Sequence, residues 1–213
     1  MALKTEAELK EIENHLIEMG QLVRSMHVDI KKALEIKDSK LALDVIKRDE
    51  VVNNLDEMIN EKALALLATQ APVARDLRSV IAMIRTATDL ERIGDYAKSI
   101  GDFIILSKPL YIPFKEYIDG MFGTFIEMYD EALSIFVKNE YDKVTKIVQK
   151  DQLIDNKLKK AWSIVNQSIN QNDLMSVLDT FSILRIYERA GDHTKNVCEA
   201  VIFKVKGKKI DLG

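Results

Sequence analysis

The stretch LERIGDYAKS at residues 90–99 returns in altered form as YERAGDHTKN at residues 187–196. Both copies keep Glu-Arg-x-Gly-Asp, followed by a lysine three residues after the aspartate. A gapless alignment of residues 76–100 with 173–197 gives 9 identities in 25 positions, at Asp76, Leu77, Ser79, Val80, Glu91, Arg92, Gly94, Asp95 and Lys98 of the first copy. We therefore predict that the chain contains a duplicated structural unit.

The segments upstream of this stretch repeat as well. VIKRD at residues 45–49 corresponds to IVQKD at residues 147–151, although a five-residue difference in the intervening loop changes the register. Apolar residues recur at spacings of three and four, which is typical of amphipathic helices. The predicted helices cover residues 9–34, 41–66, 73 to beyond 100, 114–138, 142–171 and 174–206.

Breaks between the predicted helices divide the chain into two halves. Asp-Ser at residues 38–39 and Ala-Pro at residues 71–72 interrupt the first half, and Ser, Lys and two prolines within residues 107–113 form the mid-chain linker. Because no segment alternates with period two as a strand would, we predict an all-α fold. It consists of two tandem three-helix bundles, a spectrin-like internal repeat, with residues 5–107 in the first and 113–206 in the second.

Composition restricts the class of protein. The chain has 213 residues, 47% apolar and 31% charged, which is typical of a helix-rich globular protein. The formal net charge of −3 provides no overall attraction to nucleic acid or to anionic lipid. The single cysteine excludes an intrachain disulfide, and neither a signal peptide nor a long apolar run is evident. We expect a cytoplasmic protein without a nucleic-acid partner.

In the last helix of each repeat, acidic residues continue the apolar stripe. At 100° per residue, Glu91 falls in the middle of the face that includes Val80, and Asp95 lies about 50° from the centre of that face. The second copy places Glu188 and Asp192 in the same way. These carboxylates are therefore expected to point toward the interior.

The middle helix of each repeat adds further acidic residues. Asp151 and Asp155 interrupt the apolar stripe of their helix on its centre line, and Asp49 and Asp56 lie near the stripe edge of the first repeat, with Asn53 further round. Each half thus directs carboxylates from two helices toward one shared space. Burying an ionised carboxylate costs several kcal/mol, so these groups need protonation, a basic partner or a bound cation.

Basic partners are available within the same helices. A basic residue lies three residues to either side of each aspartate: Arg92 and Lys98 flank Asp95, and Arg189 and Lys195 flank Asp192. Surface ion pairs of this kind are common and weak. They leave unexplained the mid-stripe acids and the retained Gly94 and Gly191, each of which costs a helix about 1 kcal/mol. A glycine here would let a neighbouring helix bring its oxygens close, and we favour a metal site.

The donor types restrict the metal. All candidate donors are oxygens, which suit magnesium, calcium, manganese or ferric iron better than copper or thiolate-bound zinc. The Glu-x-x-His pairs of di-iron carboxylate proteins are absent, because Gly94 and Gly191 follow the glutamates at that spacing. His193 is turned about 140° from Glu188 on the helical wheel. We find no phosphate-binding loop, HExxH zinc site or nucleophile with a recognisable base, and therefore expect no enzymatic activity and no organic cofactor.

Two alternative functions remain open at this point. A metal-dependent phosphohydrolase would need an open coordination position for water. A plain helical scaffold without metal would carry its acids as surface ion pairs.

The chain resembles the PhoU family of phosphate-signalling regulators over almost its whole length. The resemblance is carried by Met-Gly at residues 19–20, VIKRD at 45–49, APVARDLR at 71–78 and both acidic stretches. It implies two three-helix bundles related by a pseudo-twofold axis. It also implies acidic Glu-x-x-x-Asp motifs that hold multinuclear iron or zinc clusters in some relatives.

Carried over to this sequence, the implied metal ligands are Asp49, Glu91, Asp95, Asp151, Asp155, Glu188, Asp192 and Asn196. The first copy has Ser99 where the second has Asn196, and Asn53 where the second has Asp155. The first site is therefore poorer in carboxylate, and we expect it to bind more weakly or to stay empty.

The resemblance implies a role as well. It is that of a non-enzymatic negative regulator of phosphate uptake and of the phosphate-starvation response. The implied partners are the ATP-binding subunit of a phosphate ABC transporter and a sensor histidine kinase. Through these partners the protein would associate peripherally with the membrane, as a homodimer.

Overall fold

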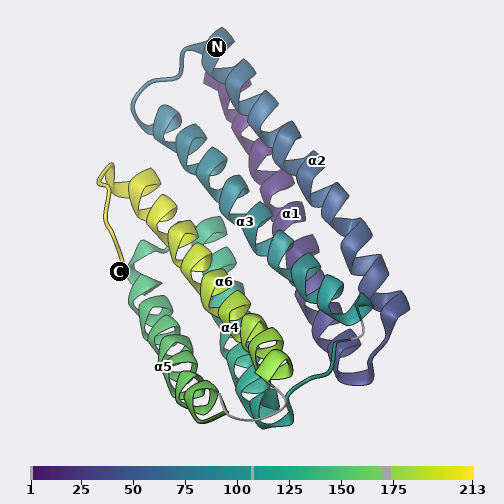
Figure 1. Ribbon diagram of the computed structural model, residues 1–213. Coiled ribbons are helices and arrows are strands. Elements are labelled where there is room, and N and C mark those ends of the chain that lie inside the picture. The colour runs from purple at the N-terminus through teal and green to yellow at the C-terminus, as the bar shows by residue number, and fades with distance from the viewer. Residues whose placement is uncertain (1, 107, 169–173) are drawn as a thin grey trace.

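The computed structural model describes residues 2–106, 108–168 and 174–213, and these residues form helices joined by short connections (Figure 1). The α-helices are α1 Ala2–Ile36, α2 Ser39–Gln70, α3 Arg75–Ile105, α4 Lys115–Lys138, α5 Val144–Ser168 and α6 Leu174–Lys206. Single 3₁₀ turns, Ile112–Phe114 and Tyr141–Lys143, precede α4 and α5. The predicted all-helical fold of two three-helix bundles is confirmed. The predicted helical residues 169–171 and the linker residue Ser107 lie outside the described residues.

Local sequence explains where the helices begin and end. The Asp38 carboxylate caps α2 by accepting the backbone N–H groups of Lys40 at 2.9 Å and Leu41 at 3.0 Å. Ala71 adopts a left-handed conformation with φ of 43° and ends α2 ahead of Pro72. At the other end of the chain, α6 stops at Gly207, whose φ is 67°.

The two repeats pack side by side through their last helices. Figure 1 shows α3 and α6 adjacent at the centre of the molecule, with α2 on the outer side of α3 and α5 on the outer side of α6. Helices α1 and α4 complete the two bundles and contact each other. The two helix pairs that carry the acidic residues, α2–α3 and α5–α6, thus lie next to each other. A single apolar core extends through both repeats.

Polar contacts join α1 to α4 across the repeat boundary. Arg24 forms a two-pronged ion pair with Asp130, at 2.5 and 2.8 Å, and the buried Tyr129 hydroxyl donates to the Gly20 carbonyl oxygen at 2.9 Å. Helix periodicity puts Trp162 in line with the apolar residues of α5, but this side chain is 51% exposed. It packs on the Phe181 ring at 5.3 Å between centroids instead of entering the core.

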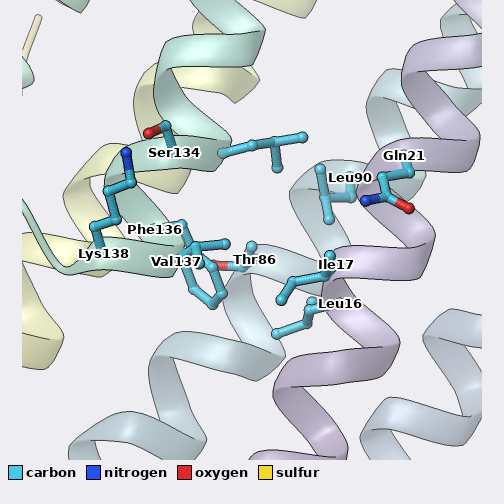
Figure 2. A pocket seen from close by; sticks show the side chains of 10 residues that line it. Leu16, Ile17, Gln21, Thr86, Leu90, Ser134, Phe136, Val137 and Lys138 are labelled. Carbon is cyan, nitrogen blue, oxygen red and sulfur yellow. The ribbon is translucent and has the colours of Figure 1, made fainter.

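A crevice of about 240 Å³ lies where α1, α3 and α4 meet (Figure 2). Its walls are mainly apolar and include Leu16, Ile17, Leu90 and Phe136, and the buried Thr86 hydroxyl also lines it. Among the described residues no acidic side chain lines it, so the predicted site residues lie elsewhere. Within the described residues, none of the helices combines the length and apolar character needed to cross a membrane.

Candidate metal centres

The first acidic cluster lies between α2 and α3. Asp49 is 2% exposed, and its Oδ2 atom accepts a hydrogen bond from the Lys98 ammonium group at 2.6 Å. Its other oxygen, Oδ1, is buried and has no hydrogen-bond partner among the described residues. Glu91 and Asp95, one turn apart on α3, are half-buried beside it, and Arg92 contacts Asp95 at 3.2 Å. The fold therefore brings the three predicted acids of the first repeat, Asp49, Glu91 and Asp95, into one cluster.

Asp56 belongs to this cluster, although the sequence-based ligand set omitted it. Burial raises the pKa of Asp56, and its Oδ1 atom is also buried without a partner in the described part of the chain. The pKa of Glu91 is raised first by burial and then by the charges of Asp95, Asp56 and Asp49, against the opposing effect of Arg92. A seven-residue spacing from Asp49 puts Asp56 on the same helix face two turns later, as the stripe pattern predicts, and only the ligand set implied by the resemblance leaves it out.

The second cluster repeats the arrangement between α5 and α6. Asp151 is 4% exposed, and Lys195 contacts its Oδ2 at 2.6 Å and Asp192 at 3.1 Å. The Asp151 Oδ1 atom is buried and unpartnered within the described structure. Asp155 and Glu188 are half-buried nearby. The four predicted carboxylates of the second repeat therefore share one space.

The acids of the second cluster also perturb each other electrostatically. Burial raises the pKa of Asp151, and the Lys195 ammonium group works in the opposite direction. The pKa of Glu188 is raised by burial first, and then by the charges of Asp192 and Asp155. Raised pKa values at Asp151 and Glu188, caused first by burial and then by neighbouring carboxylates, are typical of functional sites.

The two repeated glycines have different neighbours. A β-carbon added at Gly191 would lie 3.1 Å from the Asp151 Oδ1 atom, so this glycine makes room for the buried carboxylate. At Gly94 the nearest atom would be a methyl group of Val52, at 3.3 Å. The expectation that a glycine admits an oxygen from the neighbouring helix is met in the second repeat, whereas Gly94 admits an apolar side chain.

Asn196 and His193 point to a different neighbour. The Asn196 amide donates to the Asp89 carboxylate at 3.0 Å, and the His193 Nδ1 atom lies 2.9 Å from the same Asp89 oxygen. The His193 ring also stacks obliquely on Tyr96, with 5.7 Å between centroids. These residues connect α6 to α3, so the structure pairs Asn196 with Asp89 and not with the acidic cluster.

One lysine from the last helix offsets part of the charge of the four carboxylates in each cluster. Lys195 contacts Asp192 of its own helix, as the spacing predicts, and both Lys98 and Lys195 reach the buried aspartate of the neighbouring helix. Across the described residues, no three His, Cys, Asp or Glu side chains are arranged to hold one metal ion. The donor set nevertheless fits a hard cation, because all donors are carboxylate oxygens and both clusters contain a buried oxygen without a partner.

Comparison with known proteins finds the same family in a family model and in full-length relatives. The family model described as PhoU domain matches residues 16–104 and 118–201. The PhoU homolog of Clostridium acetobutylicum, a "phosphate-specific transport system accessory protein", is 31% identical over 97% of this chain and 96% of its own. Homolog 1 of Thermotoga maritima is 32% identical over 96% of this chain and 90% of its own.

Two solved structures are similar as well. The crystal structure of PhoU from Pseudomonas aeruginosa matches with a TM-score of 0.86 at 31% identity, covering 95% of this chain and 99% of that one. The phosphate transport system regulatory protein PhoU from Streptococcus pneumoniae matches with a TM-score of 0.89 at 27% identity, covering 97% and 99%. Two copies of the family domain, full-length relatives and the shared helical architecture establish that this chain belongs to the PhoU family.

Proposed function

We propose that this protein is a negative regulator of phosphate uptake and of the phosphate-starvation response. It acts as a cytoplasmic, homodimeric adaptor between the ATP-binding subunit of a phosphate ABC transporter and a sensor histidine kinase. Its contact with the membrane is made through these partners. The repeat units are residues 5–107 and 113–206.

The observation that carries this proposal is similarity along nearly the whole chain to proteins named as phosphate transport accessory or regulatory proteins. The fold suits docking, because six helices of 24 to 35 residues leave long polar faces on the outside of a continuous core. An adaptor needs such faces and no bond-making chemistry.

A deletion strain tests the regulatory role. In medium rich in phosphate, loss of the protein should leave phosphate uptake and a phosphate-starvation reporter switched on, and the wild-type gene supplied in trans should switch both off again. Normal repression in the deletion strain would refute the proposal.

We further infer that the acidic clusters bind iron, zinc or another hard cation. The buried, unpartnered Oδ1 atoms of Asp49 and Asp151 support this inference. Asp49, Asp56, Glu91 and Asp95 would hold the ion in the first repeat, and Asp151, Asp155, Glu188 and Asp192 in the second. A bound cation would neutralise the clustered carboxylates and cross-link the middle and last helices of each repeat.

Elemental analysis of the purified protein tests metal binding. We expect bound transition metal, and the double substitution Glu188→Gln with Asp192→Asn should empty the second cluster. Protein that contains no metal, and whose stability is the same with and without chelator, would count against the inference.

Two alternatives predict other outcomes. A phosphohydrolase would turn over a phosphoester and lose that activity on Asp151→Asn. A helical scaffold would tolerate Asp155→Leu without a change in metal content or in repression.

A further inference from the structure

We infer that Lys98 and Lys195 are built-in counter-ions that an incoming cation must displace, and that the segment after α6 makes Lys195 the harder of the two to displace. This inference rests on the metal sites proposed above. It predicts an order of loading in which the first repeat binds a cation before the second.

The lysines and a cation compete for the same two aspartates through different oxygens of each carboxylate. Each ammonium group lies 2.6 Å from the Oδ2 atom of a buried aspartate, Asp49 in the first repeat and Asp151 in the second. The other oxygen of each aspartate is buried and unpartnered within the described residues, so it is the atom left for a second cation. Two positive charges on one small carboxylate repel each other in a partly buried site. Binding of a divalent ion to Oδ1 therefore favours withdrawal of the lysine from Oδ2.

Lys98 is free to withdraw. Its side chain is 39% exposed, and Asp49 is the carboxylate that it contacts. The hydrogen bond to Asp49 raises the pKa of Lys98, and the nearby charges of Asp95 and Asp102 raise it further. A rotation of the flexible lysine side chain would bring its ammonium group into water, where it is well solvated.

Lys195 is held more firmly, although it occupies the equivalent position in the repeat. Its side chain is 8% exposed and contacts two carboxylates, those of Asp151 and Asp192. The ammonium group also donates to the backbone carbonyl oxygen of Gly213. Lys195 therefore has three oxygen partners, one of which comes from outside the acidic cluster.

Residues 207–213 form the element that closes over Lys195. The chain reverses at Gly207, and the Leu212 backbone N–H donates to the Glu199 Oε1 atom at 2.9 Å. The Leu212 side chain packs on the apolar core. The path to water that Lys98 has is thus covered for Lys195. Cation binding to the second cluster therefore has to open this segment, which makes it weaker than binding to the first cluster.

This order is the reverse of the one expected from the sequence. Counting carboxylates made the first site the poorer one, because Asn53 replaces an aspartate. Asp56 restores the count to four, and the lysine partners now decide the difference. The energetic cost of releasing the lysine, rather than the number of acids, sets the relative affinity.

Lysine footprinting during a Mn²⁺ titration tests the inference on the full chain. Chelator-treated protein is titrated with Mn²⁺, binding is followed by calorimetry, and acetylation of each lysine by acetic anhydride is measured by mass spectrometry. Lys98 should become more reactive at a lower Mn²⁺ concentration than Lys195. Lys47, an exposed lysine of α2, serves as the control whose reactivity stays constant.

Two substitutions separate the lysines from the covering segment. Lys98→Met keeps the side-chain length without the charge and should tighten Mn²⁺ binding to the first cluster by about tenfold or more. Glu199→Ala removes the acceptor of the Leu212 N–H group, and should lower the Mn²⁺ concentration at which Lys195 becomes reactive. Glu199→Ala leaves the buried Lys195–Asp151 pair intact, so it avoids the folding defect expected of a Lys195 substitution.

The outcomes are distinguishable. If no variant binds Mn²⁺, the metal proposal fails. If Mn²⁺ binds while the reactivity of Lys98 and Lys195 stays unchanged, the metal proposal stands and the counter-ion inference is overturned. If Lys195 responds first, or if Glu199→Ala has no effect, the role of residues 207–213 is overturned.

Discussion

Glu188→Gln should stabilise the protein at neutral pH when metal is absent. Glu188 lies one turn before Asp192 on α6 and near Asp155 of α5, and its pKa is raised by burial and by both of these charges. A carboxylate whose pKa is raised on folding binds its proton more tightly in the folded chain. It therefore costs stability that begins as the pH rises above its unfolded pKa and is complete above its raised folded pKa, and glutamine removes that cost.

The size of the effect follows from the two neighbours. A pair of like charges four residues apart on a helix costs about 0.2–0.5 kcal/mol, and the charge across the helix interface costs a similar amount. We expect a gain of about 0.5–1 kcal/mol, which corresponds to a rise in Tm of about 1–4 °C for a chain of this length. The gain should disappear below about pH 4.5, where glutamate itself becomes protonated.

Urea unfolding in chelator, at pH 7 and at pH 4, measures this difference. Glu61→Gln is the matched control, because Glu61 is an exposed residue of α2, and it should change stability by less than about 0.5 kcal/mol. A Glu188→Gln protein that is less stable than wild type at pH 7 would refute the argument. It would mean that the glutamate makes a stabilising contact in the folded protein.

Three further predictions concern other parts of the fold. Burial lowers the pKa of His27 to about 4, so the stability that this residue contributes above pH 6.5 is lost as the pH falls toward 4. His27→Gln should reduce the slope of the unfolding free energy against pH in this range by up to about 1.4 kcal/mol per pH unit. An unchanged slope would contradict this prediction. Burial raises the pKa of the Cys198 thiol to about 12, so iodoacetamide should label the native protein far more slowly than the unfolded protein, and equal rates would be inconsistent with this packing. Asp89→Ala removes the acceptor of His193 at 2.9 Å and should cost about 1–3 kcal/mol in urea unfolding; a neutral result would show that this contact does not hold α3 against α6.

The fold could be predicted from the sequence because apolar residues recur at helical spacing and several helix ends are marked. The Asp38 cap and the Ala71 turn lie where capping and proline rules place them. The exposure of Trp162 could not be predicted, because the stripe of a helix gives the direction of a side chain but not the extent of its neighbours. Only the packing of α5 on α6 decides how far the core reaches.

The candidate site could be predicted in part. The clustering of Asp151 with Glu188 follows from helix periodicity and from the repeat. The choice of Asp49 and Asp151 as the partners of Lys98 and Lys195 depends on how far a long, flexible side chain reaches across a helix interface. Sequence spacing cannot give that distance. It predicts the contact of Lys195 with Asp192 within α6, which the structure contains at 3.1 Å, but not the contacts of both lysines with the neighbouring helix.

The most direct test of the central claim is a crystal structure of protein loaded with zinc or iron, with diffraction data collected at the absorption edge of the metal. We predict anomalous peaks beside the Oδ1 atoms of Asp49 and Asp151, with the ammonium group of Lys98 turned away from its aspartate at the occupied first site. Intact Lys98–Asp49 and Lys195–Asp151 pairs without an anomalous peak in either cluster would contradict the account.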